Sequence, residues 1–269
     1  AHNALPPLRA VLADDDVEVR CQAAKTLGDQ RDADAVAPLM TLLHDDQPRV
    51  RVHAGIALSR VGNPIALQPI VDMLRVSDDD PYLRHAGVMV MTRCGDGRFV
   101  EQLIDDESPA VQLAALVAMR RMGNPNIARF LDSSNPRLVL EAARAINDVP
   151  INEATEYLAH MTDQDDIHVD ALRRAMYAAF RVGDANRLAD AAANEHVDPT
   201  LRVMAAHLLG LWSDPPNRDV VTGAWQPMSS HAIEPAQNAL AGLFAEPHPA
   251  TPADVTAEAV RAICKLRGH

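Results

Sequence analysis

The sequence predicts an all-α protein: an α-α superhelix, a right-handed solenoid of about eight helical hairpins, with residues 1–269 as a single domain. Two observations predict this fold. A helix-initiating pattern returns along the chain at intervals of one helical hairpin. Apolar residues make up 48% of the chain but aromatic residues only 3%, so the core is built from small aliphatic side chains that let helices pack closely. One irregular excursion, residues 213–235, interrupts the hairpins.

The repeated pattern consists of a capping residue, proline, a variable residue, an apolar residue and arginine, followed by two small residues. Its clearest copies begin at Gln47, Asp80 and Asp198, and looser copies begin at Asp16, Ser108, Asn135 and His168. The arginine position forms a column whose members are 27 to 33 residues apart by subtraction: Arg20, Arg51, Arg84, Gln112, Val139, Leu172 and Arg202. A spacing near 30 residues corresponds to one pair of helices.

Each copy of the pattern begins the second helix of a pair. The capping side chain accepts hydrogen bonds from free amides of the first turn, and proline next to it loses no helical hydrogen bond. Before the copy at Gln47, apolar residues at helical spacing predict a first helix over residues 34–44. We expect five glycines to end second helices in the left-handed conformation: Gly28, Gly62, Gly95, Gly123 and Gly183.

The excursion over residues 213–235 contains four prolines, Pro215, Pro216, Pro227 and Pro235, and no helical pattern. Helical patterns resume over residues 236–244 and again after Thr251, where the last helix runs to Gly268. Because the chain begins at Ala1 and ends without a polar capping repeat, we expect a fragment of a longer multidomain chain.

Trp212 and Trp225 are the two tryptophans of the chain, and both flank or occupy the excursion. A large ring in an alanine-rich solenoid either anchors such a loop, which is the interpretation we favour, or forms a contact with a partner protein. Arg218 and Asp219 lie between them and can fix the loop by hydrogen bonding. Trp212, Arg218 and Trp225 are therefore the candidate partner-contact residues.

The arginine column has two interpretations. Arg20, Arg51, Arg84 and Arg202 could bind an anionic ligand, or each guanidinium could reach a carboxylate or carbonyl between neighbouring repeats. We favour the structural role, with partners near residues 14–16 and 45–46.

Other kinds of site find little support in the sequence. A net charge of −12 argues against nucleic acid as a partner, and no apolar run is long enough for membrane insertion. Cys21, Cys94 and Cys264 lack CxxC spacing, and His53 and His85 lack metal-ligand spacing. The aspartates near residues 14–16, 78–80 and 163–166 are interpreted as solvated turns. We therefore expect no catalytic, cofactor-binding or metal-binding residues.

The arginine behind the cap and the paired small residues resemble HEAT and HEAT-like repeats. Three segments, 80–89, 140–150 and 213–227, together resemble the HEAT region of planctomycete-type putative membrane-bound dehydrogenases. Those proteins combine a sugar-dehydrogenase-like propeller, helical repeats and a c-type haem module. The resemblance implies an extracytoplasmic protein, periplasmic or secreted. This chain has no CxxCH and no strand-rich segment, so the family's redox centres have no counterpart in it.

The functional prediction is a noncatalytic protein-interaction or scaffolding module that links or docks the redox modules of such a dehydrogenase. Its partners are then neighbouring domains of the same chain or a redox partner protein. The alternative is an enzyme or tetrapyrrole-binding protein of the bilin-lyase type, because short HEAT-like repeats also resemble those lyases. A DNA glycosylase built on such repeats is disfavoured by the charge of −12.

Overall fold

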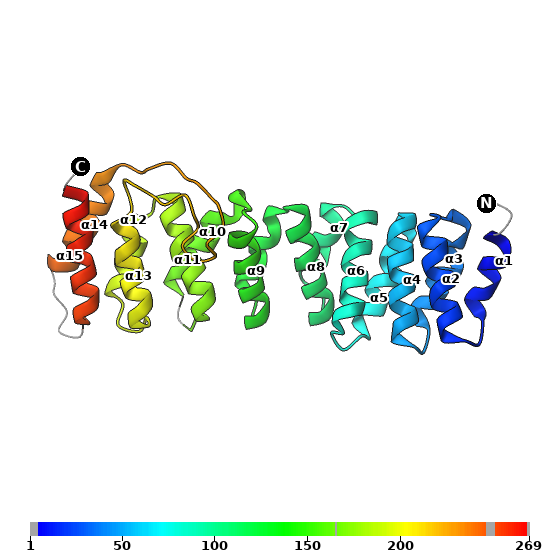
Figure 1. Ribbon diagram of the computed structural model, residues 1–269. Helices are drawn as coiled ribbons and strands as arrows, with labels where there is room; N and C mark the ends of the chain where they lie inside the picture. Colours follow the sequence, from blue (N-terminus) through cyan, green and yellow to red (C-terminus); the bar gives the residue numbers. More distant parts are fainter. Residues whose placement is uncertain (1–4, 165, 246–250, 268–269) are drawn as a thin grey trace. The chain divides into compact units, whose positions relative to one another are not determined.

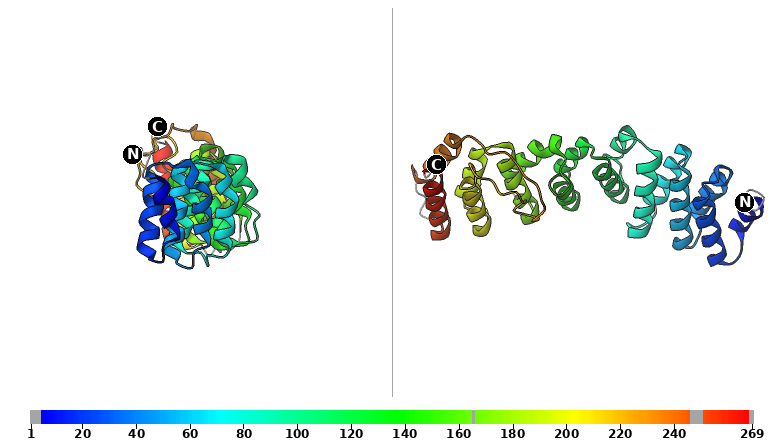
Figure 2. Two further views of the ribbon diagram at one scale, coloured as in Figure 1. Left: turned by 90° about the vertical axis from the view of Figure 1, so that its right-hand side faces the viewer. Right: turned by 45° about the horizontal axis from the view of Figure 1, so that its top comes forward.

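The computed structural model describes residues 5–164, 166–245 and 251–267, and in this part of the chain it is all-helical, with one isolated β-bridge. The chain divides into two compact units, Ala1–Asn126 and Ile127–His269. Within each unit, helices pair and the pairs stack side by side (Figures 1 and 2). The predicted fold class, stacked helical hairpins of the solenoid type, is confirmed, and the single domain stays a prediction.

The first unit contains four successive pairs: α1 with α2, α3 with α4, α5 with α6, and α7 with α8. The first helices of these pairs are short, and 3-10 turns extend α1, α3 and α5; the second helices are longer and stack on one another. The first helices are α1 (Leu5–Ala10), α3 (Val36–Thr41), α5 (Leu67–Arg75) and α7 (Gly97–Gln102). The second helices are α2 (Val17–Asp29), α4 (Pro48–Val61), α6 (Pro81–Cys94) and α8 (Pro109–Met122).

The second unit follows the same plan after the 3-10 segment η6 (Pro125–Asp132), within which the boundary falls. Helix α10 pairs with α11, α12 with α13, and α14 with α15. The bounds are α9 (Pro136–Asp148), α10 (Thr155–His160), α11 (Val169–Val182), α12 (Ala185–Ala193), α13 (Pro199–Leu209), α14 (Ile233–Ala245) and α15 (Ala253–Arg267).

Most of the predicted caps begin the second helices. Asp16, Asp80 and Asp198 accept hydrogen bonds from first-turn amides, and the shortest for each lies between 2.7 and 2.8 Å. Asn135 and His168 cap α9 and α11 in the same way. Gln47 and Ser108 differ, because their side chains make no capping bond; the proline at the next position still fits the free first turn.

The apolar stripes form the core. The first helix of the second pair buries Val36, Leu39 and Leu43, and the facing helix α4 buries Val50, Ala54, Ala57 and Leu58. Because each stripe is covered only when the neighbouring pair packs on it, the repeats stabilise one another.

Three of the five predicted glycine stops are confirmed: Gly62, Gly123 and Gly183 adopt positive φ after their helices. The prediction is wrong for Gly28, which lies inside α2. A Cβ at Gly28 would come within 2.6 Å of the Cα of Ala57, so this glycine allows close packing of α2 on α4. Gly95 does end α6, as predicted, but its backbone is extended and not left-handed.

The excursion is irregular, as predicted, but it ends earlier. Helix α14 begins at Ile233, so Pro235 lies in its first turn, where a missing amide costs no helical hydrogen bond. The predicted end of the last helix at Gly268 lies outside the described residues.

Candidate interaction surface

The excursion between α13 and α14 contains a small hairpin, residues 217–226. The backbone amide of Asp219 donates to the carbonyl of Ala224 at 2.9 Å, and that of Gln226 donates to Asn217 at 2.9 Å. Arg218 and Trp225 face each other as an antiparallel bridge between the two short arms. We call this segment the 217–226 hairpin.

Asp219 forms the turn of the hairpin. Its Oδ1 accepts hydrogen bonds from the amides of Val221, at 2.6 Å, and Thr222, at 2.9 Å. The chain then reverses at Gly223, whose φ of 72° is in the left-handed region that favours glycine. Local chemistry in the sequence therefore explains why the excursion turns at this point.

The same aspartate anchors the hairpin to the repeats. Asp219 is only 2% exposed, and its Oδ2 accepts a hydrogen bond from Nδ2 of Asn147 in α9 at 2.9 Å. With its amide oriented to satisfy both neighbours, Gln226 donates to Asp219 Oδ2 and accepts from Nη1 of Arg181, each at 3.1 Å. A buried carboxylate with this many donors holds the hairpin in one position.

Charged and polar groups of α11 lie under the hairpin. Burial raises the pKa of Tyr177 to about 12, and the negative charge of Asp219 acts in the same direction. Burial also lowers the pKa of Arg181, whose Nη2 donates to Asn152 at 2.8 Å. Tyr177 therefore stays neutral at physiological pH, and these side chains form a closed structural cluster.

Trp212 provides the second anchor, at the beginning of the excursion. It is 1% exposed, and its ring lies 5.7 Å from Phe180 and 4.8 Å from His231 between ring centroids. His231 Nε2 lies 2.8 Å from the carbonyl oxygen of Phe180. The favoured interpretation of Trp212 as an anchor of the excursion is therefore confirmed, and its alternative role as a partner contact is wrong, because packing against α11 buries the ring.

Trp225 and Arg218 lie on the other side of the hairpin. Trp225 is 67% exposed, while the next residue, Gln226, points inward to Asp219. Arg218 is exposed, and its Nη1 donates to the carbonyl of Gly223 at 2.9 Å. The alternation of side chains along extended backbone places this pair toward solvent and Asp219 toward the repeats.

The arginine column lies elsewhere, near the turns that lead into the second helices. Arg20 donates to both carboxylate oxygens of Asp45, at 2.9 and 3.1 Å, and to the carbonyl of Asp14 at 2.7 Å. Arg84 pairs with Asp79, and Arg202 is buried, with its Nε 2.9 Å from the carbonyl oxygen of Ala192.

Arg51 differs from the other members of the column. Its Nε is buried, and no hydrogen-bond partner for it is present among the described residues. The expected tie between repeats is seen for Arg20, whereas Arg84 and Arg202 find their partners, Asp79 and Ala192, within their own helical pair.

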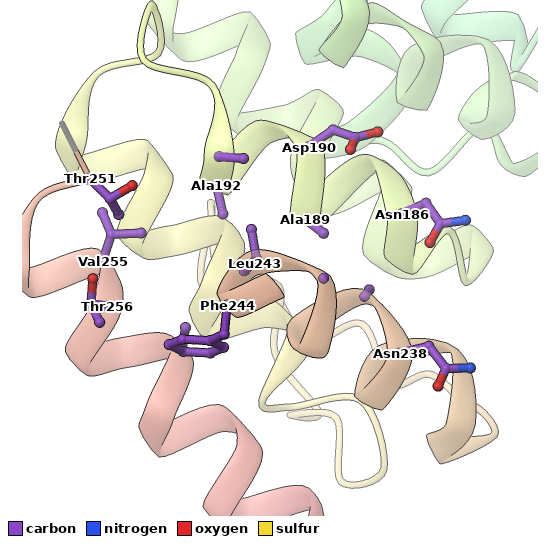
Figure 3. Close-up of a pocket in the computed structure, with 14 residues that line it drawn as sticks. Asn186, Ala189, Asp190, Ala192, Asn238, Leu243, Phe244, Thr251, Val255 and Thr256 are labelled. Atoms are coloured by element: carbon purple, nitrogen blue, oxygen red, sulfur yellow. The ribbon is translucent and has the colours of Figure 1, made fainter. Parts of the chain in front are cut away.

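A pocket of about 680 Å³ lies between α12, α14 and α15 (Figure 3). Its wall is largely apolar, with Leu243, Phe244 and Val255, and Asp190 is the one ionisable side chain among the described residues that line it. No group of three or more His, Cys, Asp or Glu able to hold a metal ion exists within the described ranges. Likewise, no helix in the part of the chain that the structure covers is long and apolar enough to cross a membrane.

Comparison with known proteins identifies a family that part of the chain matches. Residues 5–92, about a third of the chain, match the family of HEAT repeats. A search of curated protein sequences finds no match.

Among solved structures, the E. coli protein YibA is 17% identical, with a TM-score of 0.47, covering 98% of this chain and 92% of its own. The complex of CpcE and CpcF of phycocyanin lyase from Nostoc is 21% identical, with a TM-score of 0.41, covering 89% of this chain and 94% of its own. A designed armadillo repeat protein is 17% identical, with a TM-score of 0.34, covering 97% and 99%.

Proposed function

We propose that this chain is a noncatalytic protein-interaction module and that the 217–226 hairpin is a principal contact with its partner. The observation that carries the proposal is Trp225, which is 67% exposed on a hairpin whose other side is buried. Tryptophan and arginine dominate the binding energy of many protein interfaces. Because the hairpin is already ordered, a partner does not have to compensate for the entropy of ordering it.

The noncatalytic role is supported by the chemistry of the hairpin and the pocket. Asp219 uses its oxygens within the hairpin and toward Asn147, so it is occupied in a structural role. The described lining of the pocket offers a carboxylate at Asp190 without a neighbouring histidine or cysteine. A turnover assay with sugars or alcohols and a dye acceptor tests this role, and activity of the isolated chain contradicts it.

The biological context that we propose is a spacer that docks the redox modules of an extracytoplasmic dehydrogenase. This context is supported by the sequence resemblance of residues 80–89, 140–150 and 213–227 alone. Sequencing the regions that flank this chain tests it: a CxxCH motif or a strand-rich propeller supports the proposal. Flanking sequence of another kind, together with recovery of the tagged parent protein in the cytoplasm, contradicts it.

The contact itself is tested by replacing Trp225 with a photo-crosslinking benzoylphenylalanine in cells that produce the parent protein. We expect one dominant adduct whose yield falls at least severalfold when Arg218→Ala is added. The matched control carries the crosslinker in place of Val260, an apolar residue of α15 that is 47% exposed. If both positions give the same adducts, or if position 225 gives none, the hairpin is not the contact.

The bilin-lyase alternative makes a different prediction, a change in the absorption spectrum of a bilin mixed with the chain. No feature of the described residues favours it over the interaction module.

A further inference from the structure

The second helices of three consecutive repeats in the first unit carry an unusual charge distribution. Helices α4, α6 and α8 lie side by side (Figure 1). They contain three, two and two arginines respectively, and none contains Asp or Glu. The whole chain, by contrast, has 37 acidic and 25 basic residues. The acidic residues of the first unit lie in the turns and on α2, α5 and α7.

Contacts between neighbouring helices show which arginines share the solvent-exposed side. Arg49 pairs with Glu18 at 2.8 Å, Arg60 pairs with Asp29, and Arg121 Nη1 lies 3.3 Å from the sulfur of Met89. We define the basic face as the exposed side of α4, α6 and α8, which presents the residues Arg49, Arg60, Tyr82, Met89, Arg93, Arg120 and Arg121. Arg51 and Arg84 do not belong to the basic face, because their side chains are partly buried and belong to the arginine column near the turns.

The arginines near the ends of these helices are in register. Arg60, Arg93 and Arg121 each lie 13 residues after the N-cap of their helix, by subtraction from Gln47, Asp80 and Ser108. A cation near a helix C-terminus is favourable by itself. Three in register on adjacent helices also repel one another, and only Arg60 has a carboxylate partner, Asp29. Arg93, Arg120 and Arg121 have none among the described residues.

Two further features point to a ligand with carboxylates and apolar groups. Tyr82 is 72% exposed, and Met89 beside Arg121 supplies a flexible apolar surface. The positive charges also affect His53. Burial lowers the pKa of this histidine, and the charges of Arg49, Lys25 and Arg60 lower it further. A basic surface with apolar residues between its arginines is complementary to an acidic, partly apolar peptide.

We propose that the basic face binds an acidic segment of a partner protein, whose carboxylates pair with Arg93, Arg120 and Arg121 while an apolar residue contacts Tyr82 and Met89. Guanidinium groups bind carboxylates through two parallel hydrogen bonds. Packed helix axes lie about 8–10 Å apart. In a polyproline II segment three residues make one turn and span about 9 Å, and side chains at every third position lie on the same side of the segment. Acidic residues at every third position therefore meet successive helices. The inference rests on the proposed function in treating the chain as a partner-binding module, but it does not depend on the 217–226 hairpin.

The test uses the full chain and a fluorescein-labelled peptide that repeats Glu-Leu-Ser four times, with binding followed by fluorescence anisotropy. We expect saturable binding that weakens as salt is added, and no binding of the same peptide with Gln in place of Glu. The double variant Arg93→Glu with Arg121→Glu is expected to weaken binding at least about tenfold. Arg93→Lys with Arg121→Lys, which keeps the charge, retains part of the affinity.

A matched control variant separates the effect of the basic face on binding from the effect of a change in net charge. Arg98→Glu with Lys265→Glu changes the net charge equally at two exposed residues away from the basic face, and we expect less than about a twofold effect on binding. Circular dichroism verifies that each variant is folded. Trp225→Ala leaves peptide binding unchanged, so failure of the hairpin proposal and failure of this one are distinguishable.

Three results overturn the proposal. The first is absence of peptide binding to the wild-type chain, and the second is an equal loss in the control variant. The third is tighter binding of a single-stranded oligonucleotide of equal charge that the Arg93→Glu and Arg121→Glu variant abolishes, because it assigns the face to nucleic acid.

Discussion

The two units build the same repeat from different core residues. In the first unit the buried apolar side chains are not aromatic: Tyr82 is 72% exposed and Phe99 is only partly buried. In the second unit, large rings fill the core, namely those of Phe130, Tyr177, Phe180 and Trp212. The rings of Phe180 and Trp212 lie where the excursion packs on α11. Small side chains thus fill the core between regular repeats, whereas large rings fill the core where the irregular excursion packs on the repeats.

The units also differ in how their second helices use arginine. In the second unit, Arg144 pairs with Glu141 and Arg174 pairs with Asp148, so the charges are matched on and between α9 and α11. On the basic face of the first unit, Arg93 and Arg121 have no such carboxylates among the residues that the structure describes. The number of arginines alone therefore does not separate a structural role from a binding role; the carboxylates beside them do.

The largest effect is expected at the aromatic cluster of the second unit. Trp212→Ala removes a buried ring that packs on Phe180 and His231. We expect the free energy of unfolding to fall by about 3–5 kcal/mol. Urea denaturation followed by circular dichroism measures this loss. Trp225→Ala is the control, and a comparable loss there would show that both tryptophans are structural.

A smaller effect is expected from the matched charges of the second unit. Arg174→Met breaks two hydrogen bonds to Asp148, at 2.9 and 3.0 Å, between half-buried groups. The expected loss of stability is about 2 kcal/mol. The neighbouring Arg173 contacts Asp170 at 3.7 Å and is 40% exposed, so Arg173→Met should cost less than about 0.5 kcal/mol. Equal losses would remove the distinction between the two pairs.

The first unit should respond to acid at its buried carboxylates. Hydrogen bonds from Arg9 hold the pKa of Asp32 below its ordinary value. A lowered pKa in the folded state contributes stability above the unfolded pKa, about 3.9, and this stability is lost as pH falls through the folded pKa. We expect Asp32→Asn to cost about 1 kcal/mol near neutral pH and to flatten the loss below about pH 4. Unfolding curves against pH measure it, with Asp15→Asn, an exposed aspartate, as the unaffected control.

The smallest effect on stability is expected on the basic face. Arg93→Glu with Arg121→Glu breaks no ion pair among the described residues, so the free energy of unfolding should change by less than about 0.5 kcal/mol. Denaturant midpoints check this value in the same samples used for peptide binding. A large destabilisation would mean that these arginines have a structural role like Arg174.

Much of the fold was predictable because its signals are local. A capping aspartate followed by proline, as at Asp80 and Asp198, identifies the start of a helix from a few adjacent residues. Helical spacing of apolar residues then identifies the buried face, as in α4. The excursion was recognised because its prolines interrupt that spacing.

The candidate site was only partly predictable. Trp212 and Trp225 look alike in sequence, yet one is buried against Phe180 and the other is exposed on the hairpin. Their difference depends on Asn147, which is 72 residues from Asp219 in the chain and donates to its carboxylate. No local pattern reports a contact of that range.

The sequence by itself determined that helical hairpins form and repeat, because capping, proline placement and apolar spacing act within a few residues. Tertiary structure alone decided which tryptophan is exposed, that Gly28 allows a close helix approach, and which arginines find a carboxylate. Those outcomes depend on packing and electrostatic contacts between residues far apart in the chain, and such contacts exist only once the repeats have stacked.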